Sequence, residues 1–209
     1  MSVARQRIVR ATACICAMAA SAAYVHASVA QTAAAAGTRQ TLVINGCPIW
    51  PFTRCPNADL HGANLRGVNL HGADLRGANL AHADLTNSLL SGARLDGADL
   101  TGARLNMVFA PAATFSNARM TQADLTFARL AVADLNGAIL NDATLEKVSA
   151  PKARLVGADL RGANLQEAQL DDADLENADL RGANTRYAQF VGAYVANCKD
   201  CPTGAGELR

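Results

Sequence analysis

Four cysteines of this 209-residue chain lie in two close pairs near the ends of its regular part. Cys47 is followed by Cys55, and Cys198 by Cys201 in a C-x-x-C spacing. Paired thiols can form disulfides, exchange electrons or bind zinc. A redox function would need a thiol at a helix start in a thioredoxin-like βαβ unit, a context that this sequence does not offer. The four cysteines are therefore candidate disulfide residues.

Histidines and aspartates are the other side chains that could do chemistry. His61, His71 and His82 could supply imidazole ligands to a metal, and solvated surface histidines are the alternative. Recurring aspartates could in principle form a carboxylate pair for acid–base catalysis. No phosphate-binding loop, nucleophile elbow or metalloprotease motif occurs in the sequence. Whether any of these groups meet depends on the fold.

The elements that must position these side chains follow a five-residue repeat from Ala58 to Val195. Every residue number divisible by five in this span is a repeat centre, and 21 of the 28 centres are Leu. The residue two before the centre is Ala in 24 of 28 repeats. On an α-helix, residues five apart differ in direction by about 140°, so the Leu residues would form no stripe. In a continued flat strand every second triplet would face outward. The chain must therefore turn a corner between triplets.

The two residues between triplets have the composition of turns. The second is Gly in 12 repeats and Asn in four others. Both residues tolerate the positive φ that the third residue of a type II turn requires. Pro111 and Pro151 occupy the first corner position, where their fixed φ is suitable. A short fixed period with such corners is typical of a solenoid.

Exceptions to the repeat predict how many sides a coil has. Four repeats have a residue other than Ala at the position two residues before the centre: Val68, Ser88, Val108 and Val148. Their spacings of 20, 20 and 40 place them on one column if a coil has 20 residues and four sides. A ten-residue period would also fit. The two Ala centres follow Val108 and Val148, so a larger residue compensates for a smaller one.

Triplets such as Ala73-Asp74-Leu75 make the chain resemble the pentapeptide repeat proteins over about two thirds of its length. The resemblance implies an all-β fold, a right-handed quadrilateral parallel β-helix of about seven coils of four pentapeptides. It also implies that the Leu and Ala positions point inward. At about 4.8 Å per coil the rod would be roughly 34 Å long, and each inward Leu would contribute about 1.5–3 kcal/mol of apolar burial.

Five segments are expected. They are a secretory signal peptide at 1–30, an Ala-rich tether at 31–40, an N-terminal cap at 41–57, the β-helix at 58–195 and a C-terminal cap or tail at 196–209. Within the first cap, residues 41–44 are expected to form a strand and Trp50 to cover the Leu core.

The length of the rod constrains the pairing of the cysteines. The two pairs would lie at opposite ends, roughly 30 Å or more apart, whereas a disulfide needs Cα atoms within about 7 Å. The expected disulfides are Cys47–Cys55 and Cys198–Cys201. The same distance argues against a zinc site shared between the ends.

The leader predicts a periplasmic or secreted protein. It combines a basic start with an apolar core over 11–25 that is too short to span a membrane, and cleavage is expected near Ala27 or Ala30. An uncleaved or lipid-anchored leader is the alternative. Without residues 1–30 the chain has 16 Lys and Arg against 18 Asp and Glu, a formal charge of −2. This balance supplies no basic field for nucleic acid.

Apolar residues at outward positions form a predicted interaction surface. A 20-residue coil would stack Met107 on Phe127 and Leu89 on Phe109, with Val132 at the edge. A contiguous patch of this kind suggests a contact surface, and incidental surface composition is the alternative.

The same coil length distributes the polar candidates. It would bring His61 and His82 to adjacent coils at one edge and place His71 on the opposite side. Asp74, Asp134 and Asp174 would share one column with Arg94 and Arg154. That column reads as a mixed-charge ladder rather than as a catalytic carboxylate pair.

These observations predict a non-enzymatic structural or protein-binding rod without metal or cofactor. Its partner would be an unknown protein or a second copy, not nucleic acid, and the mature chain would have no stable membrane span. The family resemblance implies an alternative, because some pentapeptide repeat proteins are acidic DNA mimics that bind DNA gyrase and protect it from quinolones. The leader, the nearly neutral charge and a short polar end after Val195, with no obvious dimerising helix, disfavour it.

Overall fold

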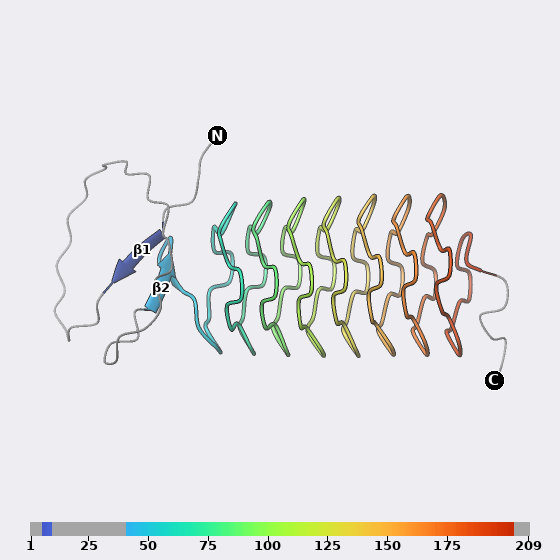
Figure 1. Ribbon diagram of the computed structural model, residues 1–209, viewed down its shortest axis with the longest axis horizontal. Coiled ribbons are helices and arrows are strands. Elements are labelled where there is room, and N and C mark those ends of the chain that lie inside the picture. Colours follow the sequence, from blue (N-terminus) through green and yellow to red (C-terminus); the bar gives the residue numbers. More distant parts are fainter. Residues whose placement is uncertain (1–5, 10–40, 203–209) are drawn as a thin grey trace.

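The computed structural model describes residues 6–9 and 41–202. The strands in this part are β1 (Gln6–Val9), β2 (Thr41–Ile44) and β3 (Cys47–Pro48), which form an antiparallel sheet in the order β1-β2-β3 (Figure 1). Asn45 and Gly46 connect β2 to β3 with φ of 47° and 83°. Positive φ at both positions of an Asn-Gly pair is typical of a tight hairpin. The predicted strand at 41–44 is confirmed.

The predicted leader and tether lie outside the described residues except for β1. The same holds for residues 203–209 of the predicted C-terminal tail.

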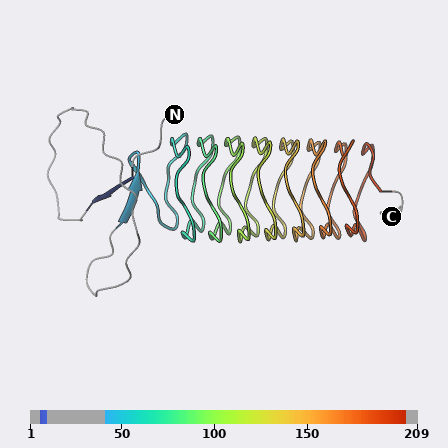
Figure 2. The same cartoon turned by 45° about the horizontal axis from the view of Figure 1, so that its top comes forward.

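Beyond this sheet the chain winds into a stack of coils (Figure 1 and Figure 2). Parallel β-bridges join residues twenty apart, from the pair Arg54–Asp74 to the pair Asp179–Lys199. Each bridge partner is the middle residue of a triplet, so one coil has four triplets and therefore four sides. The twenty-residue period inferred from the exceptions in the repeat is confirmed.

Backbone hydrogen bonds explain why the coils stack. The N–H of Leu60 donates to the carbonyl of Asn79 at 2.8 Å, and the N–H of Asn79 donates to the carbonyl of Ala58 at 2.9 Å. Within a coil, the N–H of Ala63 donates to the carbonyl of Leu60 at 3.0 Å and closes the corner. Because the pattern repeats along the stack, the backbone of a side in the middle of the rod is satisfied by the coils before and after it.

The second corner residue adopts a left-handed backbone throughout. Gly97 has φ of 65° and Asn87 has φ of 59°, as the predicted turn requires. Residues that adopt this conformation less readily occupy the same position elsewhere, among them Met107, Phe127 and Val132.

Asp and Asn recur at the middle of the triplets because their side chains complete the corner. Oδ1 of Asp84, Asp99 and Asp124 accepts a hydrogen bond from the backbone N–H two residues later, each at 3.0 Å. Such bonds from a short carboxylate or amide to the following backbone are a property of Asx turns. The polar residue of the repeat is thus a structural element of the corner.

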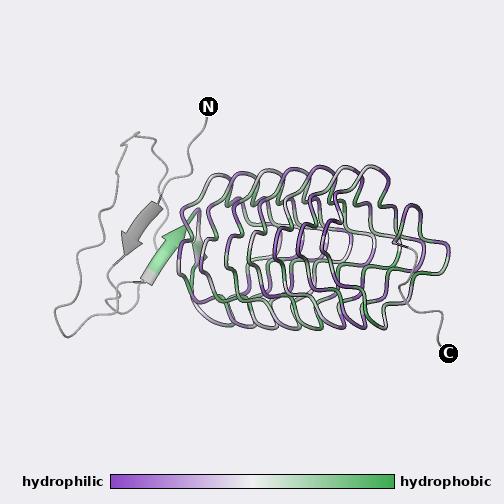
Figure 3. Ribbon diagram, turned by 45° about the vertical axis from the view of Figure 1, so that its right-hand side comes forward, coloured by the Kyte–Doolittle hydropathy of each residue, from purple (hydrophilic) through white to green (hydrophobic). Residues whose placement is uncertain are grey.

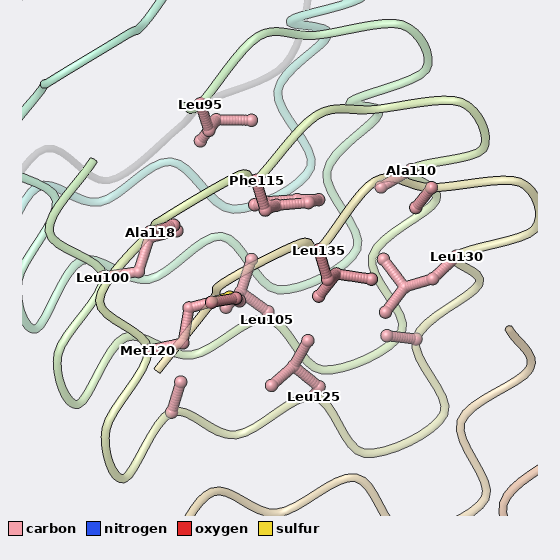
Figure 4. Packing of buried hydrophobic residues seen from close by; sticks show 14 of the residues in the cluster. Leu95, Leu100, Leu105, Ala110, Phe115, Ala118, Met120, Leu125, Leu130 and Leu135 are labelled. Carbon is pink, nitrogen blue, oxygen red and sulfur yellow. The ribbon is translucent and has the colours of Figure 1, made fainter. Parts of the chain in front are cut away.

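The core is a continuous column of inward side chains (Figure 4). The Leu centres and most of the Ala residues two before them are buried, and Phe115 and Met120 replace Leu without becoming exposed. Hydrophobic and hydrophilic residues therefore alternate around each coil (Figure 3). Val108 and Ala110 are both fully buried, in agreement with the expected exchange of volume between these two positions.

The N-terminal end of the core is closed by the hairpin and not by Trp50. Ile44, Cys47 and Ile49 are buried in the core cluster, whereas Trp50 is 45% exposed and lies outside it. The backbone N–H of Ile49 donates to the carbonyl of Leu42 at 2.7 Å, which extends the β2–β3 pairing by one hydrogen bond. The expectation that Trp50 covers the core is corrected accordingly, because the hairpin turns Ile44 and Ile49 inward at this end.

Candidate binding surface

One side of the rod gathers large exposed apolar side chains. We call it the Leu89 side, and its middle residues are bridged in the order Asn69, Leu89, Phe109, Arg129, Ser149, Gln169 and Gln189. Leu89 and Phe109 lie on adjacent coils of this side. Met107 and Phe127 follow one another at the corner before it, where the N–H of Met107 donates to the carbonyl of Thr126 at 2.9 Å. Val132 lies at the corner after it.

Five residues form what we call the apolar surface: Leu89, Met107, Phe109, Phe127 and Val132. Leu89 is 42% exposed, Met107 and Phe127 are each 51% exposed and Val132 is 60% exposed, while Phe109 is half-buried between them. The sequence prediction brought these residues together, and the structure confirms that they lie on adjacent coils.

Two cations lie over the aromatic rings of this surface. The guanidinium carbon of Arg129 is 4.9 Å from the centre of the Phe109 ring, and Nζ of Lys147 is 5.5 Å from the centre of the Phe127 ring. Both distances are within the range of cation–π attraction. Sequence reasoning missed these cations, although each one follows its aromatic residue by the coil length of twenty and could have been found by that offset.

The cations near the apolar surface differ in their pairing. Lys147 contacts Glu146 at 3.4 Å and Glu167 at 3.8 Å. Among the ion pairs of residues 41–202, none involves Arg129 or Lys152. The segments that carry this side through the surface contain no Asp or Glu; they are 87–92, 107–112, 127–132 and 147–152. The surface is therefore apolar, and its end holds a Lys147–Glu146–Glu167 cluster together with two cations outside any ion pair, Arg129 and Lys152.

The three corner residues of the apolar surface have a costly backbone. Met107, Phe127 and Val132 have φ of 54°, 58° and 59°. Val132 is the one β-branched residue with positive φ among the described residues. A left-handed conformation costs an ordinary residue about 1–2 kcal/mol, so Gly or Asn would fit these corners better.

Charged residues on the other sides mainly pair with one another. Arg181 donates to Asp179 through Nε at 2.9 Å and through Nη2 at 2.7 Å. The side-chain hydrogen bond from Arg181 holds the pKa of Asp179 below its ordinary value, and Arg161 lowers the pKa of Asp159 in the same way. Lowered values are the opposite of what a general acid needs near neutral pH.

The mixed-charge column of the sequence prediction is present. Bridges connect Arg54, Asp74, Arg94, Thr114, Asp134, Arg154, Asp174 and Tyr194 in that order. Arg154 contacts Asp134 on the preceding coil at 3.6 Å. The side-chain hydrogen bond from Arg76 lowers the pKa of Asp74. Charges of both signs therefore alternate along the column, and Asp74 and Arg94 pair with the corner residues Arg76 and Asp96.

The histidines lie where the coil length placed them. The ring centres of His61 and His82 are 5.6 Å apart in an edge-to-face arrangement, whereas His71 contacts Phe52 at 5.1 Å between ring centres. Among the described residues, no three His, Cys, Asp or Glu side chains gather in a way that could hold a metal ion.

The cysteines are adjacent within each predicted pair. The Cα atoms of Cys47 and Cys55 are 5.7 Å apart, as are those of Cys198 and Cys201, and the sulfur atoms of each pair are in contact. Both Cα distances are in the range that a disulfide requires.

Stacked coils with five-residue sides and an inward column of Leu define a solenoid of the four-sided β-helix class. The chain belongs to the pentapeptide repeat family. The family model, described as pentapeptide repeats, matches in eight copies at residues 52–80, 78–109, 112–142, 138–177 and 163–199. Members of this family fold as right-handed quadrilateral β-helices.

Solved structures of pentapeptide repeat proteins are similar to this chain. HetL from the cyanobacterium Nostoc sp. strain PCC 7120, which is involved in heterocyst differentiation regulation, is 33% identical; the match covers 69% of this chain and 68% of HetL, with a TM-score of 0.43. A trypsin-treated form of QnrB1, a plasmid-mediated fluoroquinolone resistance protein, is 19% identical over 70% of this chain and 80% of its own, with a TM-score of 0.56.

A third similar structure is Rfr23 from the cyanobacterium Cyanothece 51142. It is 25% identical over 68% of this chain and 90% of its own, with a TM-score of 0.32. No curated protein matches the sequence. In the part of the chain that the structure describes, no helix is long and apolar enough to cross a bilayer.

Proposed function

We propose that the chain is an exported, non-enzymatic protein-binding rod, and that the apolar surface on the Leu89 side is its binding surface. The observation that carries the proposal is the contiguous exposure of Leu89, Met107, Phe127 and Val132 around Phe109. Large apolar side chains that cluster on one exposed side are typical of interaction sites, whereas scattered ones are not.

The backbone at the surface supports this function. Met107, Phe127 and Val132 hold large side chains at corner positions where a left-handed backbone favours Gly or Asn. Other corners such as Gln122 and Tyr187 also have a left-handed backbone, but Val132 is the one β-branched residue among the described corners, and strain at such a residue is consistent with a function of its side chain. A contact with a partner would provide such a function.

The leader and the cysteines support an exported protein. Residues 1–30 have the composition of a secretory signal peptide. We propose that Cys47–Cys55 and Cys198–Cys201 are oxidised to disulfides in the exported chain, because oxidising compartments favour this bond and both Cα distances of 5.7 Å permit it.

The gyrase-protecting function is the less favoured alternative. A DNA mimic needs a continuous negative surface, but bridges place Arg104 between Asp84 and Asp124 on one side of this rod and Arg119 next to Asp99 on another. The similarity to QnrB1 at 19% identity concerns the fold. A protein retained in the cytoplasm would favour this alternative, whereas a processed protein outside it would favour ours.

Cell fractionation followed by crosslinking tests the proposal. We expect the processed chain in the periplasmic or secreted fraction, and we expect crosslinked partners that disappear when Phe109→Ser and Phe127→Ser are combined. Both residues lie at the centre of the apolar surface, where anchors contribute most to binding. Far-UV circular dichroism must show that the variant remains folded.

A matched control removes apolar side chains elsewhere. Ile139 is exposed on the opposite side of the rod, and Tyr187 is exposed at the corner of Phe127 but three coils further along, so Ile139→Ser combined with Tyr187→Ser should leave the crosslinked partners unchanged. Partners that survive the change at Phe109 and Phe127, or an unprocessed chain found solely in the cytoplasm, would contradict the proposed function.

A further inference from the structure

We infer that the apolar surface binds an acidic amphipathic α-helix that lies along the rod axis. This inference rests on the proposed function and specifies the partner class of the same surface. The spacing of the coils, the hydrogen-bonded state of their backbone groups and the charges around Phe109 each favour this partner.

The spacing of the coils favours a helix. Side chains in one column, such as Leu89 and Phe109, recur once per coil, and neighbouring strands are about 4.8 Å apart. One turn of an α-helix rises about 5.4 Å, so consecutive turns can meet consecutive coils over a few repeats. An extended partner places residues of one face about 6.6–6.8 Å apart, which does not match the columns.

The backbone of the Leu89 side excludes strand addition there. The N–H of Leu89 donates to the carbonyl of Val68 at 2.9 Å, and the N–H of Leu90 donates to the carbonyl of Phe109 at 2.7 Å. Strand addition requires free backbone donors and acceptors. A helix satisfies its own backbone and contributes side chains alone, which suits a side whose hydrogen bonds are already made.

Two columns of the surface fit the anchors of one helix face. Leu89 and Phe109 form the first column, and Met107 and Phe127 form the second at the adjacent corner. Apolar residues at positions i, i+3, i+4 and i+7 form a stripe of this kind on an amphipathic helix. Three to four coils span about 14–19 Å, which corresponds to about 10–13 residues of an α-helix.

The cations near the apolar surface favour an acidic helix over a basic one. Arg129 makes a cation–π contact with Phe109, and neither Arg129 nor Lys152 takes part in an ion pair among residues 41–202. Segments 87–92, 107–112, 127–132 and 147–152 hold no carboxylate, and the neighbouring Glu146 and Glu167 are paired with Lys147. Carboxylates on the flanks of the bound helix would complement these two cations, whereas lysines would be repelled.

A binding experiment with three labelled peptides and the full chain tests the inference. The first peptide has about 15 residues, with Leu at helical spacing on one face and Glu on the flanks. The second replaces each Glu by Lys, and the third places Pro in the middle of the acidic peptide to prevent a helix. Fluorescence anisotropy at low and high salt measures each dissociation constant.

We expect the acidic peptide to bind about tenfold more tightly than the basic one at low salt, since two rim charges contribute on that order, and the preference should shrink at high salt. Arg129→Glu combined with Lys152→Glu should reverse the preference. Arg119→Glu combined with Arg154→Glu, which changes the net charge equally on other sides, should preserve it. Phe109→Ser with Phe127→Ser should abolish binding of both peptides.

Val132→Asn separates a binding role from a structural one. Asn tolerates the left-handed backbone better than Val, so this change should raise the unfolding midpoint in urea while weakening the acidic peptide severalfold. A variant that is more stable and binds unchanged would remove Val132 from the binding surface.

Several outcomes would overturn the inference while leaving the proposed function intact. They are equal affinity for the helical and Pro-containing peptides, equal affinity for the acidic and basic peptides, binding to vesicles containing phosphatidylglycerol in place of the peptides, and self-association in light scattering that Phe109→Ser with Phe127→Ser abolishes. In each case crosslinked partners would still depend on Phe109 and Phe127. Partners independent of these residues would instead overturn the proposed function.

Discussion

Exchanging the larger and the smaller residue at Val108 and Ala110 tests whether the two side chains compensate for each other's volume in the core. Both residues are fully buried on the Leu89 side, and the following coil carries the common arrangement, Ala128 and Leu130, at the same positions. Val108→Ala removes the larger residue, Ala110→Leu adds a second large one, and the double variant restores the arrangement of the neighbouring coil. Each single change should therefore be harmful and the pair should be tolerated.

The magnitudes follow from the groups removed and added. Val108→Ala deletes two buried carbon groups, which costs about 1.6 kcal/mol in transfer free energy and about 2–3 kcal/mol once the cavity is included. Ala110→Leu overfills the same layer at a cost of about 1–3 kcal/mol. Because the double variant differs from the wild type by one carbon group, we expect it within about 1 kcal/mol of the wild type.

Urea denaturation measures the coupling between the two positions. A repeat array can lose cooperativity, so two probes are compared. Far-UV circular dichroism and the fluorescence of Trp50, the sole Trp of the chain, should report the same transition. The same cycle at Val148 and Ala150 is a matched control. If the double variant equals the sum of the single variants within about 0.5 kcal/mol, the two side chains do not share one volume and the reasoning is refuted.

Three smaller predictions concern single positions. Ser88→Ala should raise the free energy of unfolding by about 1 kcal/mol, because within the described part of the chain the buried Ser88 hydroxyl has no hydrogen-bond partner; a less stable variant in urea would contradict it. Gly97→Ala should lower stability by about 1 kcal/mol through its φ of +65° alone, since an added methyl group meets no atom within 4 Å, and Gly97→Asn should cost less. Asp179 should titrate below its ordinary pKa in carbon NMR, and Arg181→Gln should raise that pKa. The stabilising contribution of a carboxylate with a lowered pKa is present above about pH 4 and is lost as the pH falls.

The four sides of the coil could be predicted from sequence because core packing acts column by column. Val68, Ser88, Val108 and Val148 depart from Ala at one column, and the bridges between residues twenty apart confirm that column. The positions of the apolar surface and of the histidines followed from the same period. A fixed period is a long-range contact rule, which most sequences do not supply.

Other features depended on side-chain geometry and could not be predicted from the period. The hydrogen bond from the corner to Asp84 explains why Asp and Asn are common at the middle of the triplets, but spacing alone does not reveal it. Trp50 follows the five-residue register without a coil below it, since the first parallel bridge begins at Arg54. The hairpin residue Ile49 fills the end of the core instead. The five-residue register therefore predicts that a centre residue is buried where its coil has a neighbouring coil on both sides.

Because the corners are nearly identical, the number of residues that precede a side determines both the direction in which that side faces and its position along the rod. Inserting one five-residue repeat would turn every later side by a quarter of a revolution and advance it by about 1.2 Å, because four sides share one strand spacing. Inserting twenty residues would advance the later coils by about 4.8 Å and leave their direction unchanged. In gene duplication, the number of repeats gained before Leu89 would thus decide whether its side keeps its orientation relative to the β2–β3 hairpin, without any substitution in the core.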